Sequence, residues 1–163
     1  MPTDVWMLLR RDHDELERAL AVLVEPGSSA LELCDAIEAV HLGLAAHTEA
    51  ERAMLHAALD SARPPAAVYA LCAQVVAAHR SQHRTLASLE TARRGTDAWR
   101  ELAAQLRSLI GRHAEHESGC VLPALRVHLP NETYSLLAGS YASARLRALG
   151  TVPIAIFGDD ELS

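Results

Sequence analysis

The feature that most restricts the fold is a set of four long stretches in which apolar residues recur every three or four positions. This spacing gathers the apolar side chains on one face of an α-helix, and that face must be buried against other helices. The stretches span about residues 4–24, 30–60, 66–93 and 97–122, and a shorter one spans about 132–148. Short turn sequences separate them, so we expect an all-α fold: an up-down-up-down four-helix bundle with a short additional C-terminal helix and a tail.

The limits of these helices are marked by residues that commonly begin helices. Ser29 followed by Glu32 fits a capping box, and Thr96 is placed to cap the start of the fourth helix. We expect residues 1–125 to form the bundle and residues 126–163 to form a C-terminal helix and tail that pack on it. Apolar residues near the end of the tail either pack within the chain or contact a second copy in a homo-oligomer.

Polar residues interrupt every apolar stripe at positions where a plain helical bundle would carry leucine. Burying a carboxylate and several imidazoles without partners is costly, so something must offset the cost. Two explanations stay open, namely a bound metal and a metal-free bundle in which the polar groups pair with one another. The interrupting residues are His13, His47, Glu51, His79, His83, His113 and Glu117.

The spacing of these residues favours the metal. Three pairs are separated by four residues, so each pair projects from one face of its helix. Imidazole and carboxylate together suit iron or manganese and also accept zinc, and two glutamates are available to bridge two ions. His116 is left open as a ligand, as an orienting residue or as a solvent-facing one. The pairs are His47 and Glu51, His79 and His83, and His113 and Glu117.

The motifs, in this order along residues 4–125, resemble those of the hemerythrins and of the wider hemerythrin-like HHE cation-binding domains. The last motif has the spacing His-x-x-x-Glu, which is more similar to HHE domains than to the oxygen-carrying hemerythrins with His-x-x-x-x-Asp. The sequence reads His13, then His47-Thr48-Glu49-Ala50-Glu51, then His79-Arg80-Ser81-Gln82-His83, then His113-Ala114-Glu115-His116-Glu117.

The resemblance implies two iron ions bridged by carboxylates and by an oxo or hydroxo group, with manganese or zinc as alternatives. One ion would keep an open position for a small ligand. The third helix of HHE domains often supplies a single histidine, and His83 resembles it more closely than His79 does. The implied ligands are His79, His83 and His113 for one ion, His13 and His47 for the other, and Glu51 and Glu117 for the bridge.

The function implied by such a site is binding of O₂, or of a related diatomic or peroxide ligand, for storage, delivery or sensing. This interpretation favours a binding protein over a catalyst. Two alternatives remain: a diiron enzyme that acts on peroxide or NO, and a regulatory module that responds to metal.

The composition indicates which classes of partner and which cellular location to expect. The chain has fifteen arginines, no lysine and a formal net charge of −6, which gives no reason to expect nucleic-acid binding. No stretch approaches the ~20 apolar residues of a membrane span. Residues 1–15 do not resemble a signal peptide of the usual kind, and an odd number of widely spaced cysteines argues against a disulfide framework. We therefore expect a cytoplasmic protein with no membrane partner.

Overall fold

The computed structural model describes residues 4–150, and every regular element in that range is helical, as expected. The tail lies outside the described residues, and so do both alternatives for it, packing within the chain and contact with a second copy. No helix of the described part has the length and apolar character needed to cross a membrane. The elements are α1 (Val5–Val24), α2 (Ala30–Ala62), α3 (Ala66–Thr91), α4 (Asp97–His116), the π-helix η1 (Glu117–Val121), α5 (Leu122–His128) and α6 (Asn131–Gly150).

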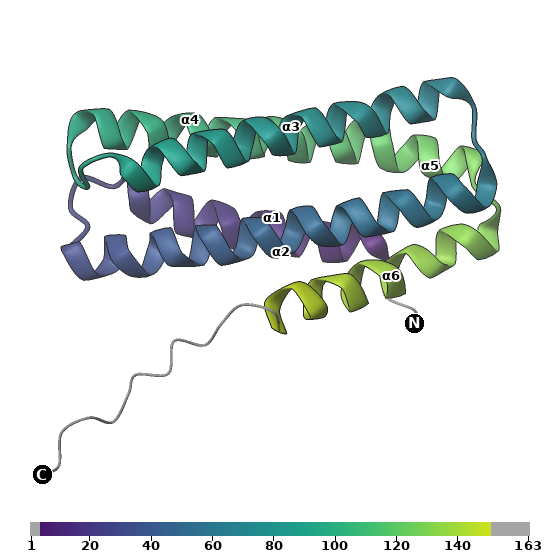
Figure 1. The fold of residues 1–163 in the computed structure, drawn as a ribbon, viewed down its shortest axis with the longest axis horizontal. Coiled ribbons are helices and arrows are strands. Elements are labelled where there is room, and N and C mark those ends of the chain that lie inside the picture. The colour runs from purple at the N-terminus through teal and green to yellow at the C-terminus, as the bar shows by residue number, and fades with distance from the viewer. Residues whose placement is uncertain (1–3, 151–163) are drawn as a thin grey trace, which may run out of the picture.

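The four long helices lie side by side, and each packs against two others (Figure 1). Helix α1 contacts α2 and α4, and α3 contacts the same two helices. The last helix, α6, runs along α2 and α1 on the outside of this group (Figure 1). Its bounds, residues 131–150, agree with the expected 132–148 to within two residues.

The predicted caps at the starts of α2 and α4 are confirmed. The backbone N–H of Glu32 donates to Oγ of Ser29 at 3.3 Å, and the backbone N–H of Ser29 donates to Oε2 of Glu32 at 2.7 Å. The backbone N–H of Trp99 donates to Oγ1 of Thr96 at 3.2 Å. Because a cap satisfies amide groups that have no partner inside the helix, it defines where the helix begins. The caps thereby determine how far along the helix axis the polar residues of α2 and α4 lie.

Two apolar clusters fill the core, with a polar layer between them. One cluster includes Leu9, Met54 and Val75, and the other includes Leu16 and Leu44. Along α1, α2, α3 and the α4–η1 segment the buried polar positions fall between residues of the two clusters, so the polar side chains lie at one height. The buried polar residues are Asp12, His47, Glu51, His79, Gln82, Thr85, His113 and Glu117.

The π-helix η1 changes the register of the chain at this layer. Pro123 follows it in the first turn of α5, and a proline has no N–H to donate to the preceding turn. Glu117, the first residue of η1, is buried, whereas Cys120 is exposed. A π-turn places its side chains at angles that differ from those of a continued α-helix, and Cys120 lies on its exposed side.

Candidate metal centre

The first group of converging side chains surrounds Glu51, which α2 places at the middle of the bundle. Nε2 of His79 from α3 lies 2.9 Å from Oε2 of Glu51, and Nε2 of His113 from α4 lies 3.3 Å from the same oxygen. His47, one turn before Glu51 on α2, has its Nε2 3.5 Å from that oxygen. All four residues are buried, and their candidate ligand atoms lie within 4.8 Å of one another. Three imidazoles and a carboxylate thus meet at one point.

The second group adjoins the first and shares His113 with it. It adds His13 from α1 and Glu117 from η1, whose Nε2 and Oε2 atoms are 3.5 Å apart. Glu117 is buried, and only 11% of the His13 side chain is exposed. The ring centroids of His13 and His47 are 4.7 Å apart, so the two groups form one continuous cluster.

Several polar atoms of the cluster are buried without a hydrogen-bond partner among the described residues. They include both carboxylate oxygens of Glu51, Oε1 of Glu117, and Nε2 of His13 and of His79. An unpaired buried polar atom is costly, and native proteins rarely leave several together. A cation held by these imidazole nitrogens and carboxylate oxygens would satisfy them, and this combination of ligands fits iron or manganese.

Burial keeps two imidazoles of the cluster neutral. It lowers the pKa of His13 to about 4, with the nearby His113 adding to the effect. It also lowers the pKa of His47 well below the ordinary value. A metal binds the neutral imidazole, so these shifts keep both rings available as ligands near neutral pH.

The two carboxylates shift in opposite directions. Burial acts to raise the pKa of Glu51, but His113 and His79 outweigh it and hold that pKa well below its usual range. Burial and the negative charge of Glu51 raise the pKa of Glu117 well above its usual range. Two acids buried this close repel each other when both are ionised, and a cation between them would relieve the repulsion.

The structure places His79, rather than His83, at the cluster. His83 is exposed, and its Nε2 lies 3.0 Å from Oγ1 of Thr48. Gln82 occupies the neighbouring buried position. This reverses the expectation drawn from the resemblance, in which His83 was the retained histidine of the third helix. The other predicted ligands, His13, His47, Glu51, His113 and Glu117, come together in the cluster.

The reason lies in the register of α3. An apolar stripe that passes through His79 and His83 also passes through Val76, but Val76 is 39% exposed, whereas Val75 is buried. The stripe through Val76 and His83 and the buried stripe through Val75 and Gln82 have Cys72, His79 and Leu86 in common. A helical period of 3.6 residues is compatible with either. His116 is partly buried and belongs to neither group of converging side chains in the described chain.

Sequence reasoning missed two residues that adjoin the cluster, Asp12 and Tyr141. Both are buried, and the Tyr141 hydroxyl lies 2.9 Å from Nδ1 of His47. A signal for Asp12 existed, because it is three residues after Leu9 and four before Leu16 and therefore falls on the apolar stripe of α1. No comparable signal marks Tyr141.

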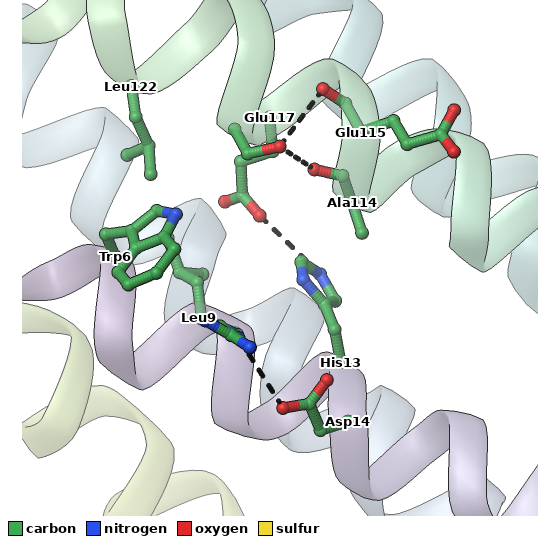
Figure 2. A pocket seen from close by; sticks show the side chains of 10 residues that line it. Trp6, Leu9, His13, Asp14, Ala114, Glu115, Glu117 and Leu122 are labelled. Atoms are coloured by element: carbon green, nitrogen blue, oxygen red, sulfur yellow. Dashed lines mark hydrogen bonds and ion pairs between the residues drawn. The ribbon is translucent and has the colours of Figure 1, made fainter.

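A cavity of about 280 Å³ leads from the surface to the second group. It lies between α1 and the segment formed by α4 and η1, and Figure 2 shows His13 and Glu117 pointing toward one another within it. An ion pair of 3.8 Å joins Arg10 and Asp14 in its wall. The lining residues are Trp6, Leu9, Arg10, His13, Asp14, Ala114, Glu115, Glu117, Ser118 and Leu122.

Fold and site together define an all-helical protein with a buried histidine and carboxylate cluster suited to a metal cation. The chain belongs to the hemerythrin HHE cation-binding domain family, whose family model matches residues 5–131. Among curated proteins and among solved structures, none matches the chain significantly. The family match ends at Asn131, the first residue of α6, so almost all of that helix lies beyond the matched segment.

Proposed function

We propose that the protein binds two iron ions at this cluster and uses them to bind O₂, or a related small ligand such as NO or peroxide, for storage, delivery or sensing. The observation that carries the proposal is the convergence of unpaired, buried ligand atoms from α1, α2, α3 and the α4–η1 segment. A metal-free bundle would leave these atoms without partners. In this proposal α1–α4 form an up-down-up-down bundle, which their pairwise packing supports.

The two groups of side chains suggest how the ions are held. One group offers the imidazoles of His47, His79 and His113 with the carboxylate of Glu51. The other offers His13 and Glu117, with His113 at the boundary between the two. The two glutamates are the residues able to bridge, because each carries two oxygens and lies among imidazoles from other helices.

A pair of iron ions supplies the redox chemistry that reversible O₂ binding requires. The residues around the site determine which molecules can reach the ions. The cavity of about 280 Å³ reaches His13 and Glu117, so a small ligand can approach from that side. Leu9 and Leu122 line this route, and Trp6 stands beside it (Figure 2). Charged side chains such as Arg10 and Asp14 line the rest of the route, and its small volume excludes large solutes.

The proposal is tested by the metal content and the visible spectrum of the protein. Protein from iron-supplemented cells should contain two irons per chain, and a visible absorption band present under air should change on anaerobic reduction. The double variant H47A/H113A should lose the iron, and H83A should keep it. Colourless aerobic protein without iron, which also fails to take up Fe²⁺ after purification, would contradict the proposal. Sustained turnover of peroxide or NO would instead identify an enzyme.

A further inference from the structure

A buried hydrogen-bond network connects α6 to the cluster. The Tyr141 hydroxyl donates to Oδ2 of Asp12 at 2.6 Å, and Nε of Arg145 donates to the same oxygen at 2.7 Å. The hydroxyl also lies 2.9 Å from Nδ1 of His47. Tyr141 has no exposed surface, and Asp12 is 3% exposed. A polar network this deeply buried is costly unless its members satisfy one another, so its geometry defines the proton positions.

The proton positions follow from counting donors. A tyrosine hydroxyl has one proton, and here Asp12 receives it. Oδ2 of Asp12 accepts from Arg145 as well, so this oxygen is an acceptor in both bonds. The bond between Tyr141 and His47 then requires His47 to donate from Nδ1. A neutral imidazole that carries its proton on Nδ1 has its lone pair on Nε2.

The Nε2 atom of His47 is the one that faces the cluster. It lies 3.5 Å from Oε2 of Glu51 and 3.4 Å from Nε2 of His113. In the other tautomer a proton would occupy this position and prevent the nitrogen from binding a cation. The choice of tautomer at His47 therefore decides whether the ring can act as a ligand.

We infer that α6 is part of the metal centre and that Tyr141, held by Asp12 and Arg145, is a positioning residue that keeps His47 in the tautomer able to bind the cation. This inference rests on the proposed metal site. Tyr141 and Arg145 lie beyond residues 5–131, so the family match does not include them. The network joins α6 to Asp12 on α1 and to His47 on α2, the two helices along which α6 packs.

The first measurement needs no metal. Nitrogen-15 NMR of the histidine rings in metal-free wild-type protein should show His47 with its proton on Nδ1. The same should hold in Y134F, which makes the same substitution at a buried tyrosine of α6 that contacts the Arg126 guanidinium instead of the cluster. In Y141F the preference should be lost. A wild-type His47 protonated on Nε2 would overturn the inference, whether or not Y141F folds.

The second measurement is the affinity for Zn²⁺, used as a colourless probe in competition with a chelator. Losing a partner that orients a ligand typically weakens metal binding about 10- to 100-fold, so Y141F should bind Zn²⁺ more weakly by that factor, and Y134F should match the wild type. Equal affinities of Y141F and Y134F would overturn the inference. If wild-type protein binds neither Zn²⁺ nor Fe²⁺, the proposed metal site itself fails, a result separate from the tautomer of His47.

Discussion

Nε2 of His79 lies 2.9 Å from Oε2 of Glu51, which joins the middle of α3 to the middle of α2 inside the bundle. Neither atom has a hydrogen-bond partner in the described chain despite this short separation. The same oxygen also faces Nε2 of His113 at 3.3 Å. Imidazole nitrogens from two other helices and a carboxylate oxygen thus point at one small volume, where a single cation could be held by all of them.

Metal should raise the stability of the protein. A ligand that binds only the folded state adds about 2.7 kcal/mol when its free concentration is 100 times its dissociation constant. For a chain of this size, that corresponds to a rise of roughly 5–10 °C in the melting temperature. Thermal unfolding of chelator-treated protein, with and without added Fe²⁺ under anaerobic conditions, measures the difference. Identical melting curves would contradict the prediction.

The two histidines of the third helix should behave differently. We expect H79A to weaken metal binding more than about tenfold, because it removes an imidazole from the cluster. H83A should leave the affinity within about twofold, because His83 is exposed and pairs with Thr48. The two variants are matched, since the residues are one helical turn apart on α3. A larger loss in H83A than in H79A would show that the register of α3 is misplaced.

Replacing Glu51 by glutamine should lower both the stability of the metal-free protein and its affinity for metal. Glu51 has no exposed surface, and E51Q keeps its volume while removing its charge. His113 and His79 hold the pKa of Glu51 low and so favour its ionised form, and removing one partner of a buried pair is destabilising, so metal-free E51Q should be less stable than metal-free wild type by on the order of 3 kcal/mol. Its metal affinity should fall steeply. Urea unfolding in chelator and a metal titration measure the two effects, and E49Q, at an exposed glutamate paired with Arg52, is the control.

The stability of the metal-free protein should depend on His13 below neutral pH. Burial lowers the pKa of His13 from 6.5 to about 4, so the unfolded chain takes up this proton more readily than the folded one. The stabilisation that His13 gives the folded state is therefore complete above the pKa of this histidine in the unfolded chain. It is lost as the pH falls toward the pKa of His13 in the folded protein. Linkage gives a loss of about 2 kcal/mol between about pH 7.5 and about pH 5.

Glu117 acts in the opposite sense, because its raised pKa stabilises the fold at low pH and that contribution fades as the pH rises. The His13 contribution is therefore isolated by comparing variants. The pH dependence of unfolding by urea should be weaker in H13N than in the wild type. It should be unchanged in H56N, at an exposed histidine paired with Asp60. Equal dependence in H13N and the wild type would show that His13 is not neutral in the fold.

Ligand access should depend on the cavity between α1 and η1. Ser118 is exposed in its wall, so S118W should slow the binding of a small probe such as azide to the iron-loaded protein by on the order of tenfold without changing the iron content. Ser81 lines a different cavity, of about 720 Å³, beside His79 and His83, and S81W is the matched control. Stopped-flow absorbance measures the rates. A slower rate in S81W alone would place the entrance on the other side.

The helices and most of the cluster could be predicted because their signals are local. Caps such as Ser29 and Thr96 act within one turn, and a histidine such as His47 is conspicuous in a stripe that otherwise carries leucine. His47 and Glu51 are four residues apart and both reach the cluster, whereas His79 and His83 have the same spacing and only His79 does. The spacing therefore identifies candidate pairs, and packing decides which members are buried.

The register of α3 and the role of α6 could not be predicted because they depend on packing. Positions 75 and 76 both fit the helical period, as do 82 and 83, and only contacts with neighbouring helices decide which of each pair is buried. Tyr141 is separated from His47 by 94 residues, and their hydrogen bond exists only because α6 packs along α2. No local pattern in the last helix points to that contact.

The polar layer that divides the core has a consequence for cooperativity. Each apolar half holds itself together by its own contacts, and across the layer the metal-free protein has mainly imidazoles and acids that lack good partners. We expect hydrogen exchange in the metal-free state to report two regions that open with different free energies. A cation held by residues from every long helix would couple the two regions, so that both open with the same free energy. Binding of the ion would then slow hydrogen exchange at both ends of the bundle.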